Sequence, residues 1–329
     1  MKKIINLPEN IVEEMLQGMV AAHPEYVKRA EGFTVLTRAS APSKKVALVS
    51  GGGSGHEPSH GGFVGKGMLD GAVAGEVFTS PTPDQVLGAI KAVDGGEGVL
   101  LVIKNYTGDV MNFEMATEMA EMEGIKVDQV VVNDDVAVEN STYTSGRRGV
   151  AGTVFVHKIA GAAAEAGKSL EEVKAVAEKV IANTRTMGMS LNPCIVPAAG
   201  KTSFELGEDE VEMGLGIHGE PGTHKEKISN ADTIVDHLLK KILGDIDFSG
   251  EVAVLVNGLG GTPLMELYIA NRRVAEVLKE KNITVTKTIV GNFMTSLEMP
   301  GFSISLIKLD EELKGYLDAV ADTPAFKQL

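Results

Sequence analysis

The amino-acid sequence predicts an α/β fold with two α/β domains, each containing a mixed or mostly parallel sheet flanked by helices. Length is the first reason, because 329 residues exceed the usual size of a single core, and a domain typically holds about 150 residues. The second reason is that short apolar runs, typical of buried strands, alternate with longer segments of helical pattern. After residue 184 the helical pattern gives way to short apolar runs and turns, which predicts domains 1–184 and 185–329. The division leaves room for a C-terminal tail that packs back on the first domain.

The first half alternates predicted strands with helices. A strand at 46–49 enters a glycine-rich segment, and a strand at 72–78 leaves it. A buried strand at 99–103 is followed by a helix at 110–123, a strand at 127–132 and a helical region at 150–182, broken near Gly167. In the helix at 110–123, four methionines recur at helical spacing, which predicts core packing: Met111, Met115, Met119 and Met122.

The second half continues the alternation. We expect a helix at 229–243, a strand at 252–256, a helix at 264–280, and strands at 285–290 and 303–309. Between the first strand and the second helix lies the glycine loop NGLGGTP. It has two interpretations: an anion site at a helix N-terminus, or a plain turn from strand to helix, which we favour.

Composition and charge exclude several classes of protein. With 43% hydrophobic and 23% charged residues, the chain is apolar enough to bury a core. A formal net charge of −14 repels nucleic acid and anionic membrane surfaces, so neither is an expected partner. The single cysteine, Cys194, excludes an internal disulfide, and the opening residues lack the apolar run of a signal peptide. No stretch approaches the roughly 20 apolar residues of a membrane span. These features predict a cytoplasmic protein.

Glycine is the unusual residue, because ten of the 38 glycines fall between residues 50 and 76. Glycine lets the backbone approach a ligand closely, so we interpret this segment as a site loop rather than a linker. His56 lies in this loop, and His218 lies in GIHGEPG. A titratable ring held by glycines can approach a small substrate, which makes both histidines candidate functional residues. His60 stays open, and the others are interpreted as ordinary surface or core residues: His23, His157, His224 and His237.

Motifs for metals and nucleotides are absent or broken. The sequence has no HExxH, CxxC or EF-hand spacing, so a zinc or calcium site has little support. Two acid pairs, Asp134 with Asp135 and Asp245 with Asp247, are interpreted as turn and helix-cap residues rather than magnesium ligands. HGGFVGKG lacks two residues of the P-loop, GGGSGH breaks the Rossmann pattern at His56, and the hydrolase elbow GxSxG is missing. The chain therefore has no convincing nucleotide site of its own.

Long motifs along most of the chain resemble the dihydroxyacetone kinases, in particular their substrate-binding K subunit. They include LVSGGGSGHEPSHGGFVGKG, GVLLVIKNYTGD, TSGRRGVAGTV, GLGIHGEPG and NGLGGTPLMELY. The resemblance implies that dihydroxyacetone is held covalently, as a hemiaminal on His218, and phosphorylated. It also implies that Asp109 and His56 serve the reacting hydroxyl, with Asp109 the preferred base. The implied substrate contacts are Gly53, Ser54, Gly55, His56, Lys104, Asp109 and His218.

The missing nucleotide motif selects between two arrangements known in this family. Because the chain stops at Leu329, before any nucleotide domain, we expect the type in which a separate L subunit supplies the phosphoryl group. The resemblance implies that a phosphotransferase M subunit recharges the ADP of the L subunit, drawing ultimately on phosphoenolpyruvate. This chain then needs no cofactor, since ADP or ATP with Mg belongs to the L subunit. A K-subunit homodimer is also implied.

Two other functions stay open. Some K-like paralogues bind dihydroxyacetone and act as transcriptional coactivators, and such a protein needs His218 but no acid or base beside the hydroxyl. The presence of both Asp109 and His56 favours the kinase. A nucleotide-dependent oxidoreductase rests only on the broken Rossmann pattern and is not favoured.

Overall fold

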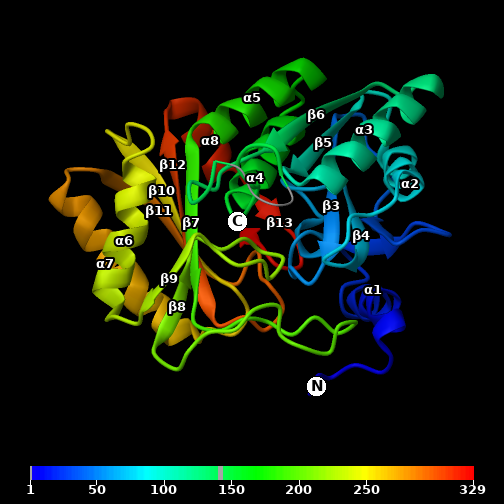
Figure 1. The fold of residues 1–329 in the computed structure, drawn as a ribbon. Helices are drawn as coiled ribbons and strands as arrows, with labels where there is room; N and C mark the ends of the chain where they lie inside the picture. The colour runs from blue at the N-terminus through cyan, green and yellow to red at the C-terminus, as the bar shows by residue number, and fades with distance from the viewer. Residues whose placement is uncertain (1, 140–143) are drawn as a thin grey trace.

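Two six-stranded sheets lie on either side of helix α4 in the computed structural model, which describes residues 2–139 and 144–329 (Figure 1). The first sheet has the order β1-β2-β4-β3-β5-β6, in which β4, β3, β5 and β6 run parallel and β1 and β2 pair antiparallel. The expected mixed sheet is confirmed. Its strands are β1 (Val27–Arg29), β2 (Val35–Arg38), β3 (Ala47–Ser54), β4 (Gly71–Val77), β5 (Val99–Lys104) and β6 (Val127–Val132).

The second sheet has the order β11-β10-β12-β7-β8-β9, with β10 and β11 pairing in parallel and the other neighbours antiparallel. The three strands expected from the sequence are confirmed as β10, β11 and β12, and β7, β8 and β9 extend the sheet beyond them. The strands are β7 (Thr184–Ser190), β8 (Glu210–Met213), β9 (His224–Lys227), β10 (Glu251–Gly258), β11 (Thr284–Gly291) and β12 (Gly301–Leu309).

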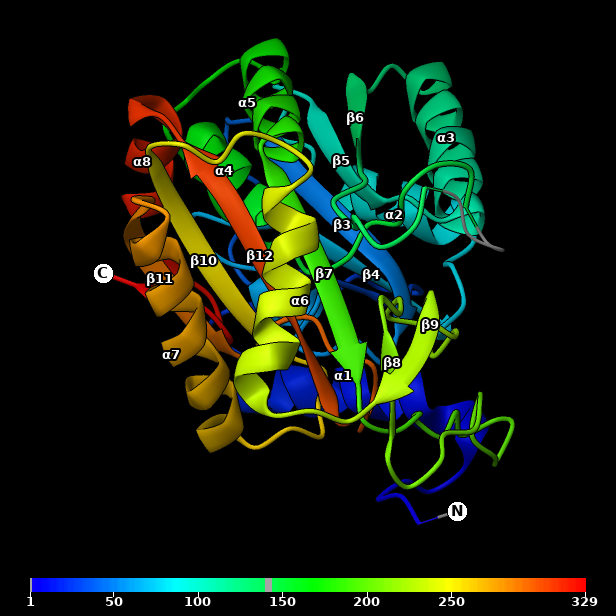
Figure 2. The same cartoon turned by 60° about the vertical axis from the view of Figure 1, so that its left-hand side comes forward.

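Helices cover both faces of the first sheet and the outward face of the second. Helices α2 and α3 pack on one face of the first sheet and α4 and α5 on the other, while α6 and α7 pack on the second sheet (Figure 2). None of the described helices is long and apolar enough to cross a membrane. The helices are α1 (Ile11–Ala22), α2 (Pro83–Val93), α3 (Thr107–Met122), α4 (Thr153–Glu165), α5 (Leu170–Ala182), α6 (Ala231–Leu243), α7 (Leu264–Glu280) and α8 (Glu311–Asp318).

Local sequence signals explain where several helices begin. Ser169 and Glu172 form a capping box at the start of α5, because each side chain accepts a hydrogen bond from the other's backbone N–H. Asn230 caps α6 by accepting from the backbone of Thr233. Gly167, with φ +77°, separates α4 from α5 at the break that the sequence predicts.

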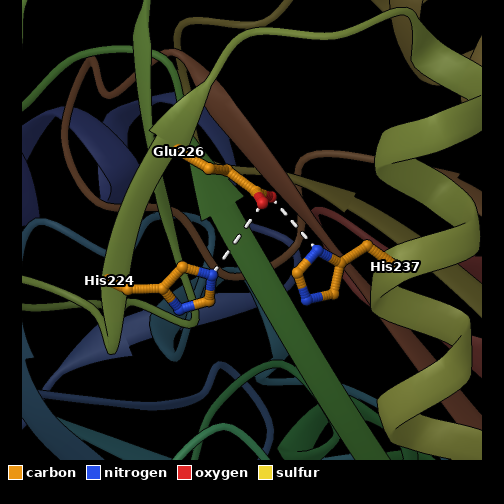
Figure 3. Close-up of side chains that lie close together, drawn as sticks. All are labelled: His224, Glu226 and His237. Carbon is orange, nitrogen blue, oxygen red and sulfur yellow. Dashed lines mark hydrogen bonds and ion pairs between the residues drawn. The ribbon is translucent and has the colours of Figure 1, made fainter.

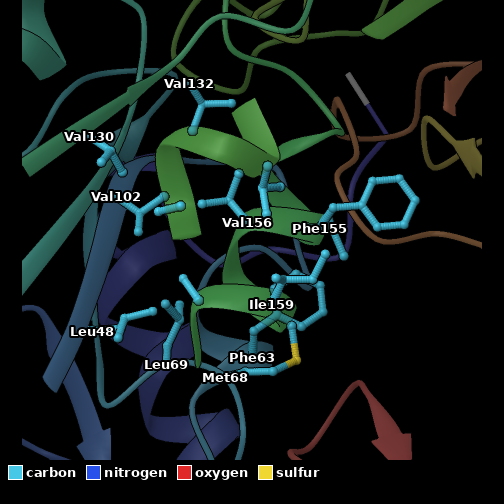
Figure 4. Close-up of a cluster of buried hydrophobic side chains, with 14 of the residues drawn as sticks. Leu48, Phe63, Met68, Leu69, Val102, Val130, Val132, Phe155, Val156 and Ile159 are labelled. Atoms are coloured by element: carbon cyan, nitrogen blue, oxygen red, sulfur yellow. The ribbon is translucent and has the colours of Figure 1, made fainter. Parts of the chain in front are cut away.

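One hydrophobic cluster joins the two sheets. Every residue of α4 from Thr153 to Ala164 is buried. Residues of the first sheet, such as Leu48 and Val102, and of the second, such as Leu255, belong to the same cluster as α4, and Figure 4 shows the part next to the first sheet. The first sheet ends before Thr184 and the second begins there. Because one hydrophobic cluster contacts both sheets, the core does not divide at that point, and domains 1–184 and 185–329 stay a prediction.

The C-terminal tail, which contains β13 (Ala321–Asp322) and β14 (Lys327–Gln328), lies against the first half of the chain. The backbone N–H of Asp322 donates to the carbonyl of Lys66 at 2.9 Å. The backbone N–H of Ala325 donates to the carbonyl of Gly62, also at 2.9 Å. The tail therefore holds the middle of the glycine-rich segment at 50–76 in place.

The structure corrects the interpretation of the methionines on α3. Met111, Met115 and Met122 are 56%, 51% and 81% exposed, so they do not pack in the core. The buried face of α3 instead carries Asp109, Phe113, Ala116 and Ala120. The methionines and the buried residues both recur at helical spacing, so spacing alone does not tell which set of side chains points toward the sheet.

The glycine-rich segment is also not all loop, because Gly51 to Ser54 belong to strand β3. Its glycines permit close packing between backbones: a Cβ on Gly51 would lie 2.6 Å from the carbonyl oxygen of Val73. In NGLGGTP, a Cβ on Gly260 or Gly261 would likewise meet backbone. The favoured reading of that segment, a turn from β10 to α7, agrees with the structure.

Candidate active site

A cavity of about 590 Å³ lies where the carboxyl end of β5 and the start of α3 face the connection between β8 and β9. The carboxyl ends of parallel strands are the usual place where α/β sheets bind ligands. The lining comes from both halves of the chain and includes two predicted site residues. It contains Phe78, Ser80, Tyr106, Asp109, His218 and Glu220.

His218 lies in the β8–β9 loop, which polar contacts hold in shape. The backbone N–H of His218 donates to Oε2 of Glu220 at 2.8 Å. The guanidinium of Arg148 donates to the carbonyl of Gly214 at 2.7 Å and to Oε1 of Glu220 at 3.5 Å. Gly214 and Gly219 have φ of +67° and +73°, in the left-handed region that favours glycine. The loop therefore presents His218 in a defined position.

The ring of His218 lies edge-on to three other rings, those of Tyr106, His56 and Phe78. The centroids of Tyr106 and His56 are 4.3 Å and 4.7 Å away. Desolvation lowers the pKa of His218 well below its usual value, and repulsion from His56 and Lys104 lowers it further. The imidazole is therefore neutral near pH 7. A neutral imidazole has a lone pair that can attack a carbonyl carbon.

His56 has a proton-accepting nitrogen that no residue in the described part of the chain contacts by a hydrogen bond. Its Nδ1–H donates to the carbonyl of Thr295 at 2.8 Å, so the lone pair is on Nε2. That nitrogen is buried and has no hydrogen-bond partner among the described residues. Burial lowers the pKa of His56 to about 3, and the charge of Lys104 adds to the effect. The ring stacks on Phe78, with 5.3 Å between centroids.

Asp109 and Lys104 place opposite charges in the same buried region. Asp109 lies in the first turn of α3, and Lys104 ends β5. Desolvation raises the pKa of Asp109 and lowers that of Lys104, while each group favours the ionised form of the other. Oδ1 of Asp109 has no hydrogen-bond partner within the described residues. A Cβ on Gly52 would lie 2.6 Å from Nζ of Lys104 and 3.4 Å from Oδ2 of Asp109, so only glycine leaves room.

Lys104 is also connected to two buried histidines that the sequence pattern did not single out. Its Nζ donates to the carbonyl of Gly51 at 3.0 Å and lies 2.9 Å from Nε2 of His60. Nδ1 of His60 lies 2.9 Å from Nε2 of His157. An ammonium group only donates, so His60 accepts at Nε2 and donates from Nδ1 to His157. The sequence left the role of His60 open. In the structure, its ring accepts a hydrogen bond from Lys104 and helps to hold that side chain in position.

The remaining predicted residues lie at the end of β3 and shape the backbone. The hydroxyl of Ser54 donates to a carbonyl of β4 at 2.7 Å. The N–H of Gly55 donates to Oε2 of Glu57 at 3.0 Å, and its φ is +102°. The structure brings His56, Lys104, Asp109 and His218 together, and of these Asp109 and His218 line the described cavity. His56, Lys104, Gly53, Ser54 and Gly55 do not line it. Substrate contact by the seven residues stays a prediction.

Two neighbours of His218 were not identified from the sequence. Tyr106 has a buried hydroxyl with no hydrogen-bond partner in residues 2–139 or 144–329, and burial raises its pKa well above the usual value. Glu220 accepts from the backbone of His218. The sequence could have identified both residues, because Tyr106 lies within the motif KNYTGD and Glu220 within the motif GIHGEPG.

The structure also revises the four acids interpreted as caps. Asp135 and Asp247 each accept the backbone N–H of the residue two positions further on, as turn residues do. Asp134 accepts from the backbone of Val150 and Gly152, just before α4 begins. Asp135 also pairs with Arg148 at 2.7 Å, and Asp245 pairs with two arginines. Burial raises the pKa of Asp135 to about 6, against the opposing effect of Arg148. The turn-and-cap interpretation is wrong for Asp245, which is held by arginines distant in sequence, and it is incomplete for Asp135, which also pairs with Arg148.

Neutral histidines, a carboxylate and a lysine around a cavity at the carboxyl end of a parallel sheet define an α/β protein that binds a small polar molecule. Comparison with known families identifies the particular family within this class. The Dak1 domain profile matches residues 17–325 of the chain. The chain belongs to the Dak1 domain family.

Three relatives illustrate the similarity. The PTS-dependent dihydroxyacetone kinase 1, dihydroxyacetone-binding subunit DhaK, of Listeria innocua is 57% identical, and the alignment covers 95% of each chain. The PEP-dependent dihydroxyacetone kinase, dihydroxyacetone-binding subunit DhaK, of Escherichia coli is 46% identical over 99% of each chain. The solved structure of the dihydroxyacetone kinase operon co-activator Dha-DhaQ has a TM-score of 0.91 at 39% identity, covering 96% of this chain and 98% of that one.

Proposed function

We propose that this chain is the dihydroxyacetone-binding subunit of a kinase that phosphorylates dihydroxyacetone to dihydroxyacetone phosphate. Its family and its 57% identity to a subunit of that description support the assignment. In this proposal the ketone is captured as a hemiaminal on His218. A nucleotide-bearing L subunit supplies the phosphoryl group, which a phosphotransferase M subunit draws ultimately from phosphoenolpyruvate. The complex would then work in the cytoplasm.

The observation that carries the proposal is a neutral His218 beside two buried proton acceptors, one on His56 and one on Asp109. In the capture step, an imidazole nitrogen bonds to the carbonyl carbon and the C=O π bond breaks. The imidazole N–H proton ends on the carbonyl oxygen, so the hemiaminal is neutral. Glycerol offers no carbonyl carbon, so covalent capture separates ketones from polyols of similar size.

Phosphoryl transfer passes through a loose transition state, so this subunit mainly orients the hydroxyl and accepts its proton. Asp109 is suited to that role, because burial raises its pKa and one of its oxygens has no hydrogen-bond partner among the described residues. Lys104 would steady the carboxylate and contact the substrate. ADP or ATP with Mg would be held by the L subunit rather than by this chain.

Native mass spectrometry with dihydroxyacetone tests the capture. We expect the wild-type chain to gain one dihydroxyacetone mass, no gain with glycerol, and no gain in His218→Ala. His23→Ala, which alters a histidine outside the cavity, should form the adduct normally. An unchanged adduct in His218→Ala would contradict covalent capture on that residue.

A coupled assay with purified partners tests the division of labour. Turnover should require the L subunit, and this chain with ATP alone should form no dihydroxyacetone phosphate. Turnover without the L subunit would refute the divided arrangement. Size-exclusion chromatography with light scattering tests the accompanying proposal that the chain forms a homodimer.

The alternative function is that of a dihydroxyacetone-sensing coactivator, which the 39% identity to such a protein supports. A sensor needs capture on His218 but no proton acceptor at the hydroxyl. An adduct without any turnover, in the presence of L and M subunits, would favour the sensor. Retention of both His56 and Asp109 favours the kinase.

A further inference from the structure

His224, Glu226 and His237 form a cluster of potential metal ligands away from the candidate active site (Figure 3). His224 and Glu226 are two residues apart on edge strand β9, so both side chains lie on one face of it. His237 comes from α6, and Figure 3 shows its ring and the side chains of His224 and Glu226 pointing toward one another. One ligand atom from each residue can be chosen so that all three lie within 4.8 Å of one another.

Contacts around His224 direct one ring nitrogen to Thr223 and the other to the carboxylate of Glu226. The hydroxyl of Thr223 donates to the carbonyl of Met213 at 3.1 Å, so it can accept from Nδ1–H of His224 at 2.9 Å. Nε2 of His224 lies 3.9 Å from Oε2 of Glu226. An imidazole nitrogen and a carboxylate oxygen that face each other at this separation can bind the same metal ion.

We propose that His224, Glu226 and His237 bind one divalent transition-metal ion, with Zn²⁺ as the best fit. Zn²⁺ takes histidine nitrogen and carboxylate oxygen at about 2.0–2.2 Å, which places tetrahedral ligand atoms about 3.4 Å apart. The two separations from Glu226 lie on either side of that value, 3.9 Å from Oε2 to Nε2 of His224 and 3.1 Å from Oε1 to Nδ1 of His237, and one ligand atom from each residue fits within 4.8 Å of the others. Binding replaces the Nδ1 proton of His237, and Nε2 then carries that ring's proton.

Thr223 supplies the supporting contact that metal-binding histidines usually have, because its hydroxyl accepts from the ring nitrogen that would not face the metal. The two histidine side chains are 46% and 28% exposed, so an ion here is open to solvent and a water can complete a tetrahedral site. Motif searches miss the cluster, because HxE on a strand and a histidine on the next helix match no zinc signature.

The location gives the site a mechanical role. The metal would link β9 to α6 at the root of the β8–β9 loop, six residues after His218. Thr223, which orients His224, also closes this loop through its backbone N–H to Met213. Metal binding would therefore restrain the loop that presents His218. The metal site itself does not depend on the proposed kinase function.

Zinc binding to the EDTA-treated full-length chain tests the proposal. Titration against a chromophoric zinc chelator should give one Zn²⁺ per chain. His237→Ala and Glu226→Gln should weaken binding by about 100-fold or more, and Thr223→Val by about 10-fold, in line with losses for supporting partners. Asp236→Asn, an exposed acid beside His237 in sequence, is the matched control and should bind normally.

Two further variants exclude other zinc ligands, and one measurement reports the loop. Cys194→Ser and His218→Ala should each retain full Zn²⁺ affinity. Hydrogen exchange at 214–227 should slow with Zn²⁺ in the wild type but not in Glu226→Gln. Absence of stoichiometric binding, or equal affinity in His237→Ala, would overturn the metal site, whereas binding without slower exchange would overturn the restraint. None of these results depends on dihydroxyacetone capture or turnover.

Discussion

Buried histidines that remain neutral dominate the chemistry at the scale of single residues. Burial lowers the pKa of His56 and His157 to about 3, and those of His60 and His218 shift in the same direction. Lys104 contributes to each shift. The rings therefore act as hydrogen-bonding and nucleophilic groups near pH 7, and the positive charge is concentrated on Lys104 beside Asp109.

His157→Gln should reduce the pH dependence of stability. Unfolded histidine takes up a proton below about pH 6.5, but folded His157 does so only near pH 3. Stability from this residue is complete above pH 6.5 and is lost as the pH falls, at about 1.4 kcal/mol per pH unit. Urea denaturation at pH 7.5 and 5.0 should therefore show a drop that is smaller in His157→Gln by about 2 kcal/mol. His23→Gln is the control, and an unchanged drop in His157→Gln would contradict a neutral buried His157.

Asp109→Asn should separate capture from phosphoryl transfer. The amide has the shape of the carboxylate but accepts no proton, so kcat with the L subunit should fall by about 10² to 10⁴-fold. The dihydroxyacetone adduct should still form in native mass spectra. Wild-type kcat in this variant would remove Asp109 as the base, and the exposed Asp232→Asn serves as the control.

At the scale of elements, the glycines of β3 allow β3 to approach the segment that follows β4. A Cβ on Gly53 would lie 2.5 Å from the backbone nitrogen of Thr79. Backbone cannot move aside as a flexible side chain can. We therefore expect Gly53→Ala to lower the free energy of unfolding by about 1–3 kcal/mol.

Gly18→Ala is the matched control for that change. Gly18 lies within α1, and a Cβ there would meet nothing within 4 Å. Alanine should stabilise the helix by about 0.5–1 kcal/mol. Denaturant unfolding of both variants should move the free energy of unfolding in opposite directions, and stabilisation by Gly53→Ala would contradict the packing account.

Element prediction from sequence succeeded where the pattern was strong. Strand β6 and helix α7 match their predicted bounds, because the valine-rich run of β6 and the helical spacing of buried residues in α7 lie between clear breaks. Strand β9, His224–Lys227, has no apolar residue and pairs only at the sheet edge, so no hydrophobic pattern marks it. The methionines of α3 misled because helical spacing is shared by its buried and exposed faces.

The site was predictable where contacts follow a motif and not where they depend on the fold. His218 and Asp109 lie in long motifs, so resemblance identified them. The pairing of His60 with His157 joins residues 97 positions apart and depends on α4 crossing the first sheet. No local pattern carries that information.

At the scale of the whole molecule, the cluster around α4 should make unfolding a single event. Residues of β5 and of β10 belong to this same buried cluster, so separating the two sheets would expose it, although each sheet has a further cluster of its own under its outer helices. We expect hydrogen-exchange protection of β5 and of β10 to be lost at the same urea concentration. Loss at two separate concentrations would show that domains 1–184 and 185–329 unfold independently.

The two sides of the cavity come from different parts of the fold, with His218 on the β8–β9 loop and Asp109 at the start of α3 beside the first sheet. The proposed capture group and the proposed base are therefore held by different structural supports. A gene duplicate that loses its proton acceptors could keep its grip on the ketone and become a receptor. This division of labour between two structural supports offers a simple evolutionary route between catalysts and sensors on one scaffold.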